Sequence, residues 1–258
     1  FYFTKMPGNS PAMGAAPLTE EETAVTDRLK DTCEMLAHQI GQRSTTKIGN
    51  VDLAREYIEQ KLAKLSLHPK EKVFTTRGFT GVNFESEIAG TGTLGEILVL
   101  GAHYDSEPYS PGGGDNASGC AVLLEVAKGL AGGIHSRTIE IVFFDFGSSR
   151  FAGSDDAGSH YWAENVRRDG KNVLAMLSFD SIGRFTDEAG SQRGPFPLSV
   201  CYPSQGNFLL FAGDLGTRQL VQVCIETMRG MGDFPCEGVT LPGLIPGVGS
   251  SDHYAFRQ

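Results

Sequence analysis

Apolar residues recur along the chain with two different spacings, and together these predict an alternation of helices and strands. Segments in which apolar positions return every three or four residues are expected to be helices. They span 19–40, 51–65, 119–127, 153–168 and 215–231. Short apolar runs rich in β-branched and aromatic residues are expected to be strands. They span 72–77, 82–88, 97–102, 137–146 and 173–179, with 208–211 as a short helix or strand. This order predicts an α/β fold, with three α/β/α layers around a mixed, mainly parallel sheet.

The beginning of the chain differs from the rest in composition. Residues 1–17 are rich in Pro, Gly and Ala and are expected to form a flexible N-terminal arm. Residues 18–258 contain no internal repeat and no linker, which predicts a single domain. The first residue is Phe1 and not Met, so we expect that an upstream segment has been removed. Such a removal favours an extracytoplasmic or secreted location.

Charge and cysteine content argue against several classes of function. The 31 Asp and Glu residues outnumber the 22 Lys and Arg residues, and the absence of a basic stripe argues against nucleic acid as a partner. No apolar run reaches the roughly 18 residues that a membrane-spanning helix requires. The five cysteines have no C-x-x-C spacing, which disfavours a zinc ribbon or a redox pair. In an oxidising compartment, one disulfide among Cys201, Cys224 and Cys236 is expected.

The stretch 101–119 carries the strongest chemical signal. His103 follows the apolar run 97–100, and Asp115 precedes the helical pattern that starts at Gly119. His103 therefore lies at the carboxyl end of a strand, where ligands bind in open α/β sheets. Asp105 can accept the second ring N–H of His103 and so orient the imidazole, as is usual at metal sites. The alternative is a connection whose polar residues only form turns, but the combination favours a metal site.

Two further residues have the chemistry and the placement of metal ligands. Asp180 directly follows the strand 173–179, and His253 stands near the end of the chain. Zinc sites are built from nitrogen and oxygen ligands that converge from different elements. We therefore predict that His103, Asp115, Asp180 and His253 bind metal in one cleft.

These motifs resemble those of the M28 family of zinc aminopeptidases, and the similarity extends over about residues 18–258. The matching stretches are Gly101–Ser106, Gly113–Gly119, 139–146 with Gly153-Ser154, Ser178–Gly183 and Ser251-Asp252-His253. The resemblance implies a pair of zinc ions bridged by Asp115, one also bound by His103 and Asp180, the other by a Glu and His253. It also implies that metal-activated water hydrolyses N-terminal peptide bonds of a peptide or amino-acid substrate.

The chain departs from the family where two adjacent glutamates are expected. In the family, the first Glu is a general base and the second is a zinc ligand. Counted back from Gly153-Ser154, these positions are Gly147 and Ser148. The His103–Asp115–Asp180 site is therefore complete, and we expect it to be occupied more readily than the site that keeps only Asp115 and His253. The family also implies a further strand and helix after Ser251-Asp252-His253.

Three interpretations of the missing glutamates remain. The chain has lost catalysis and binds peptides or partners; Asp145 or Asp155 replaces the base; or the sequence lacks a segment with the Glu pair between Phe146 and Gly147. A glutaminyl-cyclase-like enzyme is a lesser alternative, because Phe143-Phe144-Asp145 is similar to that branch, whereas 115–119 has the aminopeptidase form. We take an M28-type aminopeptidase, impaired by the loss of both glutamates, as the predicted function.

Overall fold

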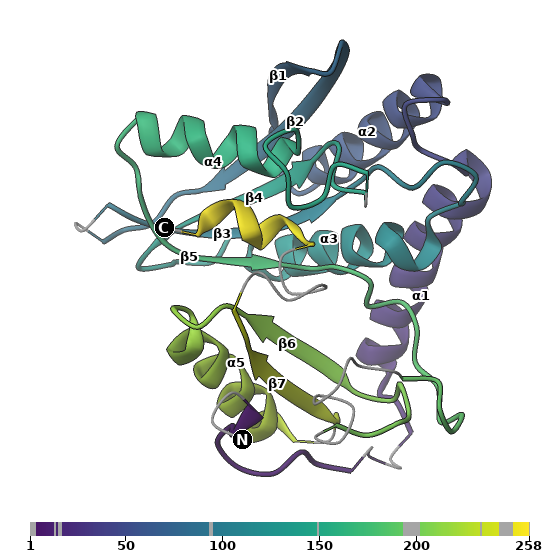
Figure 1. The fold of residues 1–258 in the computed structure, drawn as a ribbon, viewed down its shortest axis with the longest axis vertical. Coiled ribbons are helices and arrows are strands. Elements are labelled where there is room, and N and C mark those ends of the chain that lie inside the picture. Colours follow the sequence, from purple (N-terminus) through teal and green to yellow (C-terminus); the bar gives the residue numbers. More distant parts are fainter. Residues whose placement is uncertain are drawn as a thin grey trace. The chain divides into compact units, whose positions relative to one another are not determined.

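The computed structural model describes residues 4–12, 14, 17–92, 95–148, 150–192, 202–232, 234–242 and 250–257 (Figure 1). It divides into two compact units. The larger unit comprises Thr19–Gly183 and Ser250–Gln258, and the smaller comprises Phe1–Leu18 and Arg184–Gly249. Among the described residues, no helix combines the length and the apolar character that crossing a bilayer demands.

The larger unit is built on a five-stranded mixed sheet with the order β1-β2-β4-β3-β5. The strands are β1 (Lys70–Thr76), β2 (Phe79–Ile88), β3 (Glu96–His103), β4 (Thr138–Phe144) and β5 (Asn172–Ser178). β3 pairs in parallel with both β4 and β5, whereas β1 and β2 form a hairpin whose second strand pairs antiparallel with β4. The predicted mixed sheet is confirmed, and its parallel part is the part that carries His103.

Helices cover both faces of this sheet, which confirms the predicted three-layer α/β/α architecture (Figure 1). The helices of this unit are α1 (Glu20–Glu34), which continues as a π-helical turn over Met35–Ile40, α2 (Ile48–Ala63), α3 (Ser118–Leu130) and α4 (Gly158–Arg168). Side chains alternate along β4. Ile141 and Phe143 pack in the core with α2 and α3, while Val142 and Phe144 pack with Trp162 of α4.

Two predicted elements differ from the structure. The helix expected from residue 153 begins at Gly158. Gly153 has a positive φ of 65°, which interrupts a right-handed helical backbone. The segment 232–258, in which the apolar pattern predicts no element, contains β7 (Cys236–Thr240) and a short 3-10 helix over Asp252–Phe256. A five-residue strand that contains Gly and Glu lacks the apolar run on which the prediction relied.

The smaller unit has its own core, in which β6 (Leu209–Gly213) pairs in parallel with β7 and α5 (Arg218–Met231) packs on them. Described parts of the N-terminal segment are bonded to it: Arg229 donates to the carbonyls of Pro7 and Gly8. Cys236 donates its N–H to Ser10 Oγ. The arm over 1–17 and the single domain over 18–258 stay predictions. Cys224 and Cys236 are free thiols, and Cys201 lies outside the described residues.

Candidate metal centre

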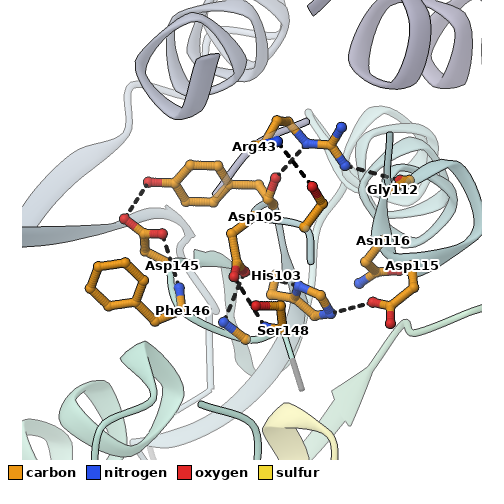
Figure 2. Close-up of polar contacts among 12 residues, drawn as sticks. Arg43, His103, Asp105, Gly112, Asp115, Asn116, Asp145, Phe146 and Ser148 are labelled. Carbon is orange, nitrogen blue, oxygen red and sulfur yellow. Dashed lines mark hydrogen bonds and ion pairs between the residues drawn. The ribbon is translucent and has the colours of Figure 1, made fainter. Parts of the chain in front are cut away.

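His103 stands at the carboxyl end of β3, and its side chain is buried. Its Nε2 atom lies 3.0 Å from Asp115 Oδ1 and 3.8 Å from Asp180 Oδ1. One ligand atom from each of these residues lies within 4.8 Å of the other two. Figure 2 shows the imidazole pointing toward Asp115. The structure therefore brings three of the four predicted ligands together as a group that could bind a metal.

Asp105 supports His103 from the buried side. Its Oδ1 atom lies 3.0 Å from His103 Nδ1 and also accepts the N–H of Gly147 at 2.8 Å, and Oδ2 accepts the N–H of Ser148 at 3.1 Å. Burial by itself would raise the pKa of Asp105, but hydrogen bonding and charge from His103, together with the backbone donors, lower it. An ionised Asp105 accepts the proton at Nδ1 and so leaves Nε2 facing Asp115, where it can bind a metal once its own proton is released.

The two carboxylates of the group come from loops at the ends of strands. Asp115 lies in the turn Gly113–Ala117 before α3, where the Asp115–Asn116 peptide bond is cis. Its side chain is 51% exposed, so the group opens to solvent on this side. Asp180 follows β5 and accepts a hydrogen bond from Ser181 Oγ at 3.0 Å. Burial opposes the ionised form of Asp180, but its contacts with His103 outweigh this and lower its pKa.

The three carboxylates act on the protonation of His103. Burial alone would lower the pKa of the imidazole, but hydrogen bonds to Asp105, Asp115 and Asp180 outweigh it and hold the pKa well above its usual value. These hydrogen bonds therefore favour the protonated form of the metal-free ring. Because a metal binds the neutral imidazole, binding at Nε2 must displace this proton.

The fourth predicted ligand, His253, lies in the 3-10 helix Asp252–Phe256 and is not part of the three-residue group. Ser251 Oγ lies 3.0 Å from Ser178 Oγ, which places the start of this helix beside the end of β5. The neighbouring Asp252 is buried, and its Oδ2 atom has no hydrogen-bond partner. Burial raises the pKa of Asp252 to about 7. The role of His253 as a ligand stays a prediction.

Gly147 and Ser148, the two positions at which the family resemblance implies glutamates, contribute their backbone to the site. A Cβ atom at Gly147 would lie 2.2 Å from Cβ and 2.4 Å from Cγ of His103, so an L side chain does not fit unless His103 moves. The N–H groups of both residues are hydrogen-bonded to Asp105, and Ser148 is buried. Neither position offers a group that can accept a proton from water.

The two alternative bases point elsewhere. Asp145 Oδ2 accepts hydrogen bonds from Val82 N at 3.1 Å and from the Tyr104 hydroxyl at 3.3 Å. Figure 2 shows Asp145 on the opposite side of Asp105 from Asp115. Asp155 is 96% exposed and lies beside the His160 side chain on the surface. Neither carboxylate forms part of the His103 group.

Sequence reasoning missed one buried residue that contacts this region. The side chain of Arg43 is fully buried, and Nε and Nη2 donate to the carbonyls of Tyr104 and Gly112. Arg43 precedes α2 in a polar loop, and such residues are usually exposed. No signal in this one sequence marks it as buried.

Comparisons with known proteins agree with the geometry. Residues 83–196 match the model of peptidase family M28. The uncharacterized protein YfbL of Escherichia coli is 29% identical over 96% of this chain and 78% of its own length. Aminopeptidase YwaD of Bacillus subtilis is 32% identical, but over only 36% of this chain and 20% of its own length.

Solved structures show the same fold. The zinc aminopeptidase BSAP from Bacillus subtilis superposes with a TM-score of 0.67 and 14% identity, over 89% of this chain and 81% of that one. A glutaminyl cyclase from Porphyromonas gingivalis reaches a TM-score of 0.60 with 18% identity, over 89% and 78%. The fold is therefore that of the zinc peptidases and glutaminyl cyclases. The match over residues 83–196 and the group of His103, Asp115 and Asp180 make this chain similar to peptidase family M28.

Proposed function

We propose that the protein is a metal-dependent aminopeptidase of the M28 type with a single high-affinity zinc site and slow turnover. The observation that carries this proposal is the convergence of His103, Asp115 and Asp180, with Asp105 behind the imidazole. One imidazole nitrogen and two carboxylate oxygens are donors that zinc accepts, and three protein ligands leave a position open, as catalytic zinc sites do. The residues present therefore fit the metal.

When bound, zinc would polarise a peptide carbonyl and lower the pKa of water. The protein's own residues have separate tasks. Asp105 holds the proton at Nδ1 of His103, and Asp115 and Asp180 supply the negative charge that compensates the cation. No side chain at 147 or 148 moves a proton from water to the leaving amine. A positioned base contributes roughly 10²–10⁴ in rate, so we expect turnover to be slower by about this factor.

A second zinc ion would be held poorly. Its site would keep Asp115 and His253, while Ser148 replaces the carboxylate that the family supplies. Two protein ligands are fewer than the three or four that zinc sites in proteins use. We therefore expect one equivalent of tightly bound zinc per chain.

The test is a joint measurement of zinc content and hydrolysis of aminoacyl p-nitroanilides. We expect about one zinc per chain and slow release of nitroaniline that both His103→Ala and a chelator abolish. His38→Ala is the matched control, because His38 is 70% exposed and lies outside the metal group. A wild-type chain that binds no zinc, or an activity that His103→Ala leaves intact, would show the proposal to be wrong.

A second candidate function is a peptide-binding protein without turnover. The close contact between Gly147 and His103 favours it, because this backbone leaves no room for a base. Zinc-dependent binding of a peptide that is recovered uncleaved after long incubation would identify this function. For the glutaminyl-cyclase-like alternative, the diagnostic product is ammonia from a peptide with N-terminal Gln. Sequencing the gene across Phe146 and Gly147 tests whether a segment is missing.

A further inference from the structure

Arg43 is the largest fully buried side chain of the described residues and is bonded entirely to carbonyls. Nε donates to Tyr104 O at 2.8 Å, and Nη2 donates to Gly112 O at 2.9 Å. Nη1 donates to the carbonyls of Leu36, Gly41 and Pro111, at 2.7, 2.9 and 2.8 Å. No carboxylate of a described residue lies within ion-pair distance of this guanidinium. Burying a cation without an ion-pair partner is costly, and the five hydrogen bonds to carbonyls offset part of this cost.

Three of these five carbonyls, those of Tyr104, Pro111 and Gly112, lie at the two ends of the loop 104–112 between His103 and Asp115. Tyr104 directly follows His103, whereas Pro111 and Gly112 directly precede the turn that carries Asp115. The guanidinium therefore bridges the two backbone segments that hold these ligands (Figure 2). Its rigid, planar set of donors can bond several carbonyls at fixed angles, which a Lys ammonium does not reproduce.

The backbone of Arg43 adds a second connection to the same loop. Its N–H donates to Ser106 Oγ at 2.9 Å, and its carbonyl accepts the N–H of Ser106 at 2.6 Å. Ser106 Oγ in turn donates to Ser110 O at 3.1 Å. Gly112 has a φ of 64°, and a Cβ there would lie 2.7 Å from Arg43 Nη2. The loop therefore contacts Arg43 at Ser106 and near both of its ends.

The side chain of Asp115 has few contacts of its own. It is half-exposed, and among the described residues its carboxylate forms an ion pair with His103 alone. Its distance from His103 must therefore be set by the backbone on which it stands. That backbone is held by Arg43 through Pro111 and Gly112.

We propose that Arg43 is a positioning residue of the metal centre, which fixes the loop before Asp115 to the end of β3 and so sets the separation of Asp115 from His103. This inference rests on the proposed metal function, and it assigns Arg43 no contact with substrate or metal. Replacement of a residue that orients metal ligands typically lowers metal affinity by about 10–100-fold. We expect a loss of that size here.

The experiment compares Arg43→Lys with Arg28→Lys in purified protein titrated with Zn²⁺ and with Co²⁺. Arg28 in α1 forms a bidentate ion pair with Glu125 in α3, so its replacement weakens helix packing without touching the loop. For Arg43→Lys we expect an affinity lower by about 10–100-fold and an altered Co²⁺ absorption spectrum. For Arg28→Lys we expect lower thermal stability with the wild-type affinity and spectrum.

The outcomes separate this proposal from the proposed function. If wild-type protein binds neither ion, the metal function is wrong and the role of Arg43 falls with it. If wild-type protein binds metal and folded Arg43→Lys binds it equally well with the same spectrum, only the role of Arg43 is wrong. Should Arg43→Lys fail to fold, Ser106→Ala removes the hydroxyl that joins Arg43 N to Ser110 O. We then expect a smaller loss of affinity in the same direction, and an unchanged affinity would overturn the proposal.

Discussion

The backbone N–H of Gly147 donates a 2.8 Å hydrogen bond to Asp105, the carboxylate that also holds His103. The family resemblance implies a catalytic Glu at this position. In this chain the same position brings the backbone close to the imidazole and reinforces the support of a metal ligand. Gly147 has no side chain that could act as a base, but its backbone N–H is hydrogen-bonded to Asp105.

Gly147→Ala tests the close contact with His103. The added methyl group would lie 2.2 Å from His103 Cβ, so the imidazole or the loop has to move. We expect a loss of about 1–3 kcal/mol in the free energy of unfolding, together with weaker zinc binding. Gly129→Ala in α3 is the control, because nothing lies within 4 Å of the added atom. There Ala should be neutral or stabilise the helix by up to about 1 kcal/mol. Equal behaviour of the two variants would contradict the contact.

Ser148→Glu tests whether a lost ligand can be returned to the second site. Ser148 is buried beside Asp105, so the new carboxylate should destabilise the metal-free protein. Zinc should reverse this effect, and the stoichiometry should rise from about one to about two ions per chain if the new carboxylate acts as a ligand. Ser148→Gln adds the same bulk without the charge and should keep the wild-type stoichiometry. An unchanged stoichiometry for Ser148→Glu, measured by metal analysis after dialysis, would argue against a second site here.

Zinc affinity should depend on pH through His103. The pKa of the metal-free imidazole is raised well above its usual value, so protons compete with zinc at neutral pH. Below this raised pKa, the apparent affinity for zinc should increase by up to about tenfold for each unit by which the pH rises. Competition with a chelator of known affinity, and calorimetry in buffers of different ionisation enthalpy, measure the released proton. An affinity that is flat with pH would mean that His103 is neutral before zinc binds.

Asp252 should make the metal-free protein less stable as pH rises. Burial raises its pKa to about 7, so folding favours the protonated form. The stability that protonated Asp252 contributes is fully present below the ordinary Asp pKa of about 4, and it is lost progressively as the pH rises to about 7. The shift corresponds to an upper limit on the order of 4 kcal/mol. Chemical unfolding of wild type and Asp252→Asn with chelator present, at several pH values, measures the difference. Parallel pH profiles would show that Asp252 does not titrate in this range.

The sequence predicted those parts of the site that depend on local pattern. His103 is at the end of an apolar strand and Asp180 follows another, and parallel strands bring such ends to one edge of a sheet. Asp105 could be predicted as a partner of His103 because the two are close in sequence. Arg43 could not, because its partners Tyr104 and Gly112 are distant in the chain and bind through backbone carbonyls that any residue type supplies. The fit of Gly147 against His103 likewise depends on tertiary contact alone.

The unequal exposure of His103 and Asp115 has a consequence for the exchange of metal. The imidazole is closed in by protein, whereas the Asp115 side chain is 51% exposed. An ion would therefore enter and leave past Asp115, with the buried imidazole as the last ligand to be released. A chelator should be able to approach along this path and withdraw zinc from the folded chain. Loss of metal would then be a local event at the surface, reversible on addition of zinc, and its rate would be independent of global unfolding.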